Sequence, residues 1–246
     1  MTTDRVPDLI VVGNLVLDDI VGPNGEVRMG VAGGAVIYAA LGAALWGTRV
    51  GLVAIAGEDY PRGVLGMLRT RGISLDGIAE RGGPGLAVRL AHAGDVSRLV
   101  PLPGRPAYAE WTPSRKTIPA GWNRPRAVFL TPMPLDNQEA LLDAVAPMGA
   151  EVSLAPHASV LAATRDRWMS VLRRVTWLFV NAGRWPSWAW SGGALRGIVL
   201  TEGSRGGRVL GPDGVRRVWH PLKTEVVDPT GAGDAFAGGV VAALLE

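Results

Sequence analysis

The sequence predicts an α/β fold with a mostly parallel central sheet and helices on both of its faces. Short apolar runs such as Leu9–Val12, Val50–Ala56 and Ala127–Leu130 are hydrophobic throughout, as expected for strands buried on both sides. Segments with helical spacing separate such runs, and this alternation is typical of parallel strands connected by helices. A chain of 246 residues, 48% hydrophobic and 19% charged, can bury a sizeable core as one large domain or two small ones.

The composition excludes several classes of protein. The chain has no cysteine, which rules out disulfides and thiolate metal sites, and no apolar run approaches the roughly 20 residues of a membrane helix. The polar start Met1–Asp8 is unlike a signal peptide, so we expect a cytoplasmic protein without a membrane partner. The sequence pI is 9.8, but the net charge is only +3 and the basic residues are scattered. Nucleic acid is therefore not an expected partner.

Two polar residues follow the first strand. Asn14 and Asp18 come after Leu9–Val12, at the carboxyl end of a strand, where open α/β sheets bind ligands. Asp18 and Asp19 are adjacent, so an extended chain points them to opposite faces, and we expect one to face a ligand and the other to face solvent. A solvated acid at a strand end remains the alternative interpretation of Asp18.

The next segment favours a hairpin followed by a helix. Asn24-Gly25 lies between short alternating runs within Val21–Val31, which is a hairpin signal. Gly33-Gly34 then precedes an alanine-rich helix at about Ala35–Trp46, which Gly47 ends. Two glycines at a helix start permit a substrate to approach closely, although a flexible entry turn explains them equally well.

The remaining elements continue the alternation. Pro84–Pro103 alternates like two strands joined at Ala93-Gly94-Asp95, and residues 108–126 read as an irregular connection. His157 follows a strand, and a packed or surface loop histidine is the favoured interpretation. The other expected strands are Glu151–Leu154, Val175–Val180, Ile198–Leu200, Val209-Leu210 and Val215–Val218, and the other expected helices are Gly63–Arg71, Asp136–Val145 and Trp168–Arg174.

A glycine-rich stretch near the C-terminus predicts an anion site. Val226-Val227 reads as the end of a strand, Asp228–Asp234 as a turn, and Ala235–Leu245 as a helix. Unpaired amides at a helix start, together with the helix dipole, favour a bound phosphate. Asp234 in this turn fits a base that accepts a proton during phosphoryl transfer, whereas helix capping is its structural alternative.

The motif Asp228-Pro229-Thr230-Gly231-Ala232-Gly233-Asp234-Ala235-Phe236 resembles the C-terminal signature of the ribokinase-like (PfkB-type) carbohydrate kinases. The first third agrees, with Val11-Val12-Gly13-Asn14, Asp18, Gly33-Gly34 and Gly57-Glu58-Asp59 in the family's order. The resemblance covers nearly the whole chain. It implies a single ribokinase-like α/β domain over residues 1–246 with a three-layer fold, in which segments at about residues 18–32 and 84–103 form a small β lid.

The resemblance also implies a function, namely an ATP-dependent phosphotransferase acting on a hydroxyl of a sugar, nucleoside or cyclitol. It makes Asp234 the general base and the Gly231–Asp234 turn, with Ala232 and Gly233, the anion hole. The implied substrate-binding residues are Asn14, Asp18, Gly33, Gly34 and Tyr38, and the implied nucleotide-binding residues are Asn181, Thr201, Gly203, Gly206, Asp228 and Thr230. The implied cofactors are ATP and Mg²⁺, with a monovalent cation as a further candidate and no protein ligand assigned to the metal. A homodimer through the lid or an exposed sheet face is the expected assembly.

The sequence departs from the family pattern at several points. Arg184 stands where the usual Asn-x-x-Glu motif has its glutamate, Ala155 where an aspartate is usual, and Tyr38 near the place of a sugar-contacting asparagine, so ribose is not singled out. Trp185, Trp188 and Trp190 could stack on a base, but packing at the sheet edge is the favoured interpretation. The chain also stops at Glu246, earlier than is usual in the family. These departures motivate an alternative, a non-catalytic relative that binds a sugar or nucleotide and acts through a partner.

Overall fold

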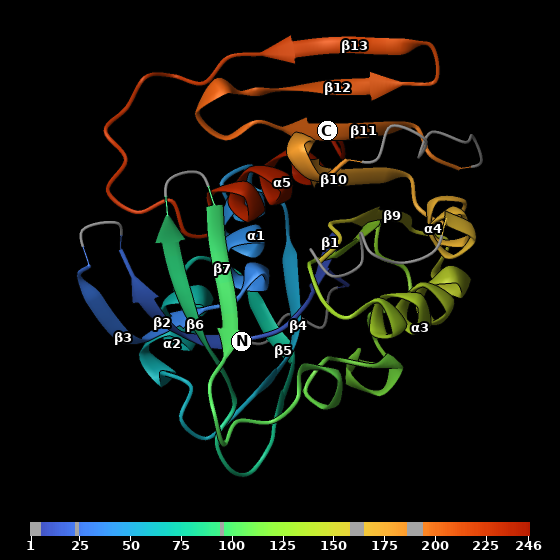
Figure 1. The fold of residues 1–246 in the computed structure, drawn as a ribbon. Helices are drawn as coiled ribbons and strands as arrows, with labels where there is room; N and C mark the ends of the chain where they lie inside the picture. The colour runs from blue at the N-terminus through green and yellow to red at the C-terminus, as the bar shows by residue number, and fades with distance from the viewer. Residues whose placement is uncertain (1–5, 23–24, 94–95, 158–164, 186–193) are drawn as a thin grey trace.

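The computed structural model describes residues 6–22, 25–93, 96–157, 165–185 and 194–246, which form two sheets with helices around the larger one (Figure 1). The larger sheet is parallel from β11 to β5 and carries the antiparallel hairpin β12–β13 at one edge. From that edge its strands are β13 (Gly214–Trp219), β12 (Gly207–Gly211), β11 (Gly197–Thr201), β10 (Trp177–Asn181), β9 (Glu151–Leu154), β8 (Ala127–Leu130), β1 (Leu9–Val12), β4 (Val50–Ala56) and β5 (Ser74–Glu80).

Helices cover both faces of this sheet, which confirms the predicted α/β class. The helices are α1 (Ala35–Ala44), α2 (Arg62–Thr70), α3 (Leu135–Val145), α4 (Arg165–Leu172) and α5 (Ala232–Ala243). Side chains from α1, α2 and α5 pack in one core with Leu9 and Val11 of β1, whereas α3 and α4 pack in a second core with Ile10 and Val12. Alternate residues of one fully buried strand therefore serve two cores, which is why these strands are continuously apolar. No helix within the described ranges is long and apolar enough to cross a membrane.

The strand order reverses next to β1. From β1 the sheet runs through β4 to β5 on one side and through β8 to β11 on the other. Such a reversal leaves a crevice at the carboxyl ends of the strands, because the connections on its two sides diverge. Asn14 after β1 and Pro132 after β8 both lie at this crevice.

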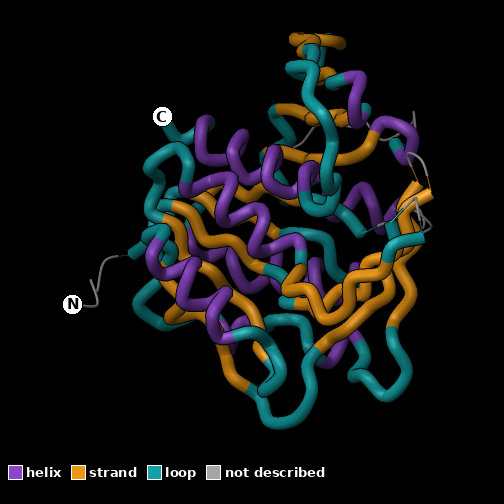
Figure 2. The backbone as a smooth tube through the Cα atoms, turned by 90° about the vertical axis from the view of Figure 1, so that its left-hand side faces the viewer, coloured by secondary structure: helices purple, strands orange, loops and turns teal. Residues whose placement is uncertain are grey.

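The second sheet confirms the predicted lid strands. Its order is β3-β2-β6-β7, with β2 and β6 parallel and the outer pairs antiparallel. Figure 1 shows these strands beside the start of α5, and Figure 2 shows the β12–β13 hairpin projecting away from the helices. The strands are β2 (Val16–Val21), β3 (Val27–Gly33), β6 (Leu86–Ala93) and β7 (Val96–Pro101).

Three local predictions were wrong. Val226 and Val227 form no strand and are 64% and 91% exposed, because the chain there crosses open surface between β13 and α5. Helix α5 begins at Ala232, earlier than predicted, since Gly231 adopts a left-handed φ of 74° and turns the chain directly into the helix. The strand β5 was missed because its sequence is half polar, as suits its place at a sheet edge. Trp188, Trp190 and the turn residues Asn24, Gly94 and Asp95 lie outside the described residues.

Close packing of α1 against α5 positions the start of α5. A Cβ at Gly42 would collide with the carbonyl oxygen of Ala235, and one at Gly238 would collide with that of Ala39. The two helices can approach this closely only because both positions are glycine. Ala235 directly follows Asp234, so this contact places the predicted anion turn.

Candidate active site

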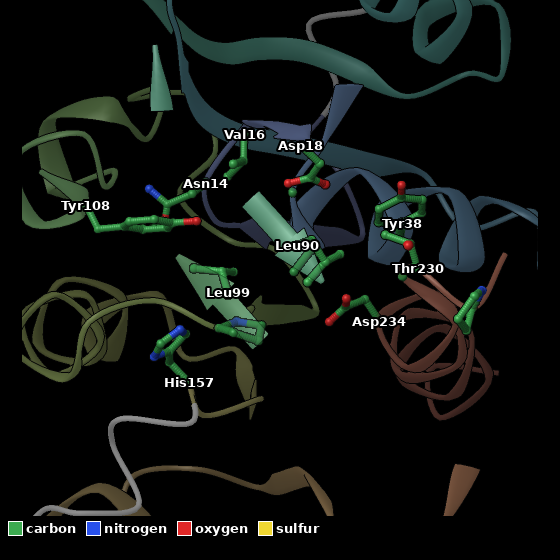
Figure 3. A pocket seen from close by; sticks show the side chains of 15 residues that line it. Asn14, Val16, Asp18, Tyr38, Leu90, Leu99, Tyr108, His157, Thr230 and Asp234 are labelled. Atoms are coloured by element: carbon green, nitrogen blue, oxygen red, sulfur yellow. The ribbon is translucent and has the colours of Figure 1, made fainter. Parts of the chain in front are cut away.

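A cavity of about 290 Å³ opens at the strand-order reversal and brings Asp18 and Asp234 together (Figure 3). We call it the first cavity. It receives residues from the end of β1, both lid hairpins, the start of α1, the loop before α5 and the loops after β8 and β9. Its lining consists of Asn14, Val16, Asp18, Gly34, Ala35, Tyr38, Leu90, Leu99, Tyr108, Pro132, His157, Pro229, Thr230, Gly231 and Asp234.

Asp234 lies in the first turn of α5. The helix has Gly231 as its N-cap, so Asp234 does not fill the capping position that was its alternative interpretation. Burial raises the pKa of the Asp234 carboxyl to about 6. The Ala235 amide donates to the carbonyl oxygen of Gly231 at 2.8 Å, but among the described residues no hydrogen bond from the amides of Gly233 or Asp234 is present. These amides are open donors beside a partly buried carboxylate.

Asp18 is only 6% exposed and lies on β2 of the lid sheet. Burial, followed by the charges of Asp19 and Asp228, raises the pKa of the Asp18 carboxyl to about 7. Gly33 is needed beside it, because a Cβ there would collide with the Asp18 carboxylate. The expectation that Asp19 faces solvent was wrong: Asp19 is equally buried and accepts a hydrogen bond from the Gly30 amide at 3.0 Å, which fixes the bulge between β2 and β3.

Asn14 lines the first cavity and holds part of its wall. Its Nδ2 donates to the carbonyl oxygen of Trp111 and to Oγ1 of Thr112, both at 3.0 Å. Thr112 Oγ1 in turn donates to the carbonyl oxygen of Tyr108 at 2.7 Å. Asn14 therefore joins the end of β1 to the turn that carries Tyr108.

Gly34 and Gly231 give the cavity its close backbone contacts. Gly34 has a φ of 105°, and a Cβ there would collide with the Asn14 carbonyl oxygen. A Cβ at Gly231 would collide with the ring of Tyr38. Tyr38 is thus packed directly on the anion turn, and burial, followed by the charge of Asp18, raises the pKa of its hydroxyl.

A second cavity of about 780 Å³ lies on the other side of the same turn. Pro229 lines both cavities, Gly231 and Asp234 line the first, and Ala232 and Gly233 line the second. Of the predicted nucleotide-binding residues, Asn181, Thr201, Gly203, Gly206 and Asp228 line the second cavity and Thr230 lines the first. The turn is therefore the boundary between the two cavities.

The second cavity suits a nucleotide by its size and by its open amides. Its walls include Trp219 and Phe236, whose rings stack at 5.2 Å. Within the described residues, no group of three His, Cys, Asp or Glu side chains could hold a metal ion. The side chain of Arg184 lies outside the described part of the chain, while Asn181 accepts a hydrogen bond from the Gly183 amide.

An ion pair joins the lid to the loop before α5. Arg28 Nη2 of β3 lies 2.5 Å from Asp228 Oδ2, and the Thr230 amide donates to Asp228 Oδ1 at 2.9 Å. Burial alone would raise the pKa of Asp228, but the bonds from Thr230 and Arg28 outweigh it and lower that pKa to about 2. Asp228 is thus a fixed negative charge in the wall of the second cavity.

The sequence prediction missed Tyr108, His157 and two lid leucines as parts of the cavity wall. Leu90 and Leu99 are cross-strand partners on β6 and β7, so the alternation there identified their strands but not the face turned to the cavity. His157 was interpreted as a loop histidine, although its position after β9 was the available signal. No sequence signal identified Tyr108, since it lies in an irregular connection.

Known proteins show the family to which this fold belongs. The family model described as pfkB family carbohydrate kinase matches residues 14–246. A cytidine kinase of Thermococcus kodakarensis is 29% identical over 250 residues, covering 96% of this chain and 87% of that protein.

Two solved structures share the fold. The nucleoside kinase of Burkholderia thailandensis in complex with inosine superposes with a TM-score of 0.78 at 15% identity, over 96% of this chain and 84% of that one. A putative ribokinase II of E. coli in complex with ATP and Mg²⁺ superposes with a TM-score of 0.76 at 14% identity, over 97% and 86%. With a family model matched from Asn14 to the last residue, this chain belongs to the pfkB family of carbohydrate kinases and is a PfkB-type carbohydrate or nucleoside kinase.

Proposed function

We propose that this kinase transfers the γ-phosphoryl group of ATP to a hydroxyl of a nucleoside, with Asp234 as general base. The observation that carries the proposal is the placement of Asp18 and Asp234 in one cavity, while the Gly231–Asp234 turn lines both this cavity and the second one. A hydroxyl acceptor in the first cavity and a phosphoryl donor in the second meet at this turn. Reaction needs such a juxtaposition, because positioning and charge stabilisation account for most of phosphoryl-transfer catalysis.

Each group in the first cavity has a part in this scheme. Asp18 accepts hydrogen bonds from hydroxyls of the substrate, and Asp234 accepts the proton of the attacking hydroxyl. With a pKa of about 6, Asp234 is largely ionised at neutral pH yet more basic than an exposed aspartate. The open amides of Gly233 and Asp234 stabilise negative charge on the transferred group. ATP would be held by the Thr201–Gly206 turn and the loop at Asp228, and its Mg²⁺ would offset the charge of the phosphates.

The relative matched in sequence over nearly the whole chain supports a nucleoside, whereas the ribokinase II shares the fold at 14% identity. The relative that aligns with 96% of this chain is a cytidine kinase, and a nucleoside kinase with bound inosine shares its fold. Tyr38 in place of the asparagine of ribose-binding relatives agrees with an acceptor other than free ribose.

We expect Asp234→Asn to lower kcat by roughly 10²–10⁴-fold, because the attacking hydroxyl loses its proton acceptor. Asparagine keeps the size of the side chain and removes a carboxylate whose charge burial disfavours, so the variant should be no less stable than the wild type in thermal unfolding at neutral pH, and ATP affinity, measured by calorimetry, should remain. In the wild type, kcat/KM should rise with pH as Asp234 loses its proton near pH 6. Unchanged turnover in the variant would refute the role of Asp234.

The substrate class is tested by coupled ADP release over nucleosides, pentoses, hexoses and inositols. Turnover with nucleosides above all supports the proposal. Turnover confined to free sugars or inositols overturns the substrate class but not the kinase. Tight nucleoside or nucleotide binding without turnover of any acceptor would instead favour the non-catalytic alternative.

A further inference from the structure

The first cavity has two chemically different ends. Figure 3 shows Tyr38, Thr230 and Asp234 on one side and Tyr108 and His157 on the other, with Asp18 between them. The Asp234 end holds a carboxylate and open amides, as a reacting hydroxyl requires. The opposite end, which we call the Tyr108 wall, consists of Tyr108, Leu99, Pro132 and His157.

The Tyr108 wall carries no carboxylate, and the side chain of Asn14 beside it is already bonded to Trp111 and Thr112. Leu99 and Pro132 offer only apolar surface, and Tyr108 offers an aromatic ring with a hydroxyl at its end (Figure 3). Leu90 and Leu99 lie directly opposite each other on β6 and β7, so the lid adds an apolar cover above the wall. The Tyr108 hydroxyl and the His157 imidazole are the polar groups of this wall, and both types of group form hydrogen bonds. A flat, largely apolar group with a polar edge fits this end better than a polyol does.

Tyr108 is held in place by the turn that carries it. Asn14 donates to Trp111 and Thr112, and Arg81 Nη1 donates to the carbonyl oxygen of Glu110 at 2.7 Å. The Arg81 guanidinium also lies 5.1 Å from the centre of the Trp111 ring. Asn137 Nδ2 donates to the carbonyl oxygen of Ala109 at 3.2 Å from helix α3. These contacts hold the turn that carries Tyr108. The Tyr108 ring is therefore preorganised as a stacking surface, because the turn loses little conformational freedom when a ligand packs on the ring.

We infer that the Tyr108 wall is the base-recognition site of this kinase, where the nucleobase stacks on the Tyr108 ring under Leu99 while His157 hydrogen-bonds to its polar edge. The inference rests on the proposed nucleoside kinase function and adds the residues that distinguish a nucleoside from its sugar. In this proposal a sugar ring is bound at Asp18 with its hydroxyl at Asp234, and the substituent on its anomeric carbon lies toward the Tyr108 wall, the end of the cavity opposite Asp234 (Figure 3). Tyr108 and His157 are thus specificity residues.

The test compares cytidine and inosine with methyl β-ribofuranoside, which keeps the sugar but has a methyl group in place of the base. We expect Tyr108→Ala to weaken nucleoside binding and to raise the nucleoside KM by roughly 5- to 100-fold, the range expected for a lost base–aromatic stack. Binding and KM for the methyl riboside should stay within about twofold of the wild type. Tyr108→Phe is the matched control, because it keeps the ring and should keep the nucleoside affinity.

His157→Ala tests the polar contact. It should raise KM for nucleosides with little change in kcat, and the rise should differ between cytidine and inosine because their edges place donors and acceptors differently. Equal losses for nucleosides and methyl riboside in these variants, or no loss for nucleosides, would overturn the base site. Unfolding temperatures are measured alongside, since Tyr108 also packs against a small core with Trp111.

Failure of the base site and failure of the proposed function give different results. Calorimetric binding needs no turnover, so the base site is tested even in a variant or a protein that does not transfer phosphate. Nucleoside turnover that is insensitive to Tyr108→Ala and His157→Ala contradicts the inference alone. Wild-type protein that binds methyl riboside as tightly as cytidine contradicts it as well, whereas retained turnover in Asp234→Asn contradicts only the assigned base.

Discussion

Two carboxyl groups of the first cavity lie in surroundings that disfavour their ionised form. Asp18 and Asp234 are both buried enough to raise their pKa values, to about 7 and about 6. Asp228 differs, since its bonds from Arg28 and Thr230 keep it ionised. Neighbouring acids with separated pKa values are typical of active sites, where one group must accept a proton and another must remain charged.

At this scale we predict that Asp18→Asn stabilises the protein at high pH. The pKa of Asp18 is raised to about 7 in the folded state. Between about pH 4 and about pH 7 the folded protein therefore keeps a proton on Asp18 that the unfolded chain has released. This contribution to stability is fully present below about pH 4 and is lost as the pH rises to about 7. Removing the acid should therefore raise the free energy of unfolding by up to about 4 kcal/mol at about pH 8 and by little at about pH 4.

Urea unfolding at both pH values checks this prediction, and the same samples should show reduced turnover. Asp19→Asn is the neighbouring comparison, because Asp19 is equally buried but accepts the Gly30 amide, and that variant should lose stability. An Asp18→Asn gain that is the same at both pH values would contradict the assignment of the penalty to ionisation.

At the scale of elements, the approach of α1 to α5 decides where the anion turn lies. Both helices are short and rich in alanine and glycine, so they pack backbone to backbone at Gly42 and Gly238. Tyr38 of α1 then closes against Gly231 at the entrance of α5. The turn is thus positioned from two sides by one neighbouring helix.

We predict that Gly42→Ala lowers both stability and kcat. The added methyl group collides with the Ala235 carbonyl oxygen, so α5 must shift, at a cost of about 1–3 kcal/mol. Because Ala235 follows Asp234, turnover should fall as well. Gly66→Ala in α2 is the matched control: nothing lies within 4 Å of its added Cβ, so it should stabilise the helix by up to about 1 kcal/mol and leave turnover unchanged. Thermal unfolding and ADP release measure both effects, and equal behaviour of the two variants would contradict the packing argument.

At the scale of the whole molecule, three parts meet around the turn: the large sheet with its helices, the lid sheet and the loop of residues 220–231. This loop lines the second cavity with Thr224, Glu225 and Val226 and ends at the anion turn. The pair Arg28–Asp228 ties it to the lid edge across 200 residues of sequence. Lid and loop are therefore connected beside both cavities.

We predict that Arg28→Gln raises KM for ATP severalfold with little effect on stability. The pair is substantially exposed, so its loss should change the unfolding free energy by less than about 1 kcal/mol. The loop, however, loses its tie to the lid and closes less well on the second cavity. Arg89→Gln on β6, an exposed lid arginine, is the control and should leave KM for ATP unchanged. An unchanged KM for ATP in Arg28→Gln, or an equal rise in both variants, would show that the Arg28–Asp228 ion pair does not contribute to ATP binding.

The expected homodimer stays a prediction. The lid edge strand β3 exposes Val27 and Met29 at 58% and 72%, which agrees with an expected contact through the lid. Sedimentation measurements on the wild type would decide it.

The sequence by itself determined those strands and turns that depend only on residues adjacent in the chain. Continuous apolar runs placed β1, β4 and β8 with their observed bounds, and the glycine-rich turn predicted the anion site, since each signal depends on neighbours in the chain. The resemblance likewise placed the lid hairpins and paired Asp18 with Asp234.

Only the tertiary structure decided what surrounds those residues. It buried Asp19, carried Asn14 to Thr112 across 98 residues, and brought Tyr108 and His157 to the cavity that holds Asp234. The physical reason is that burial and cavity walls arise from contacts between distant segments, and the spacing of residues along the chain does not encode which loops meet at the reversal of the strand order.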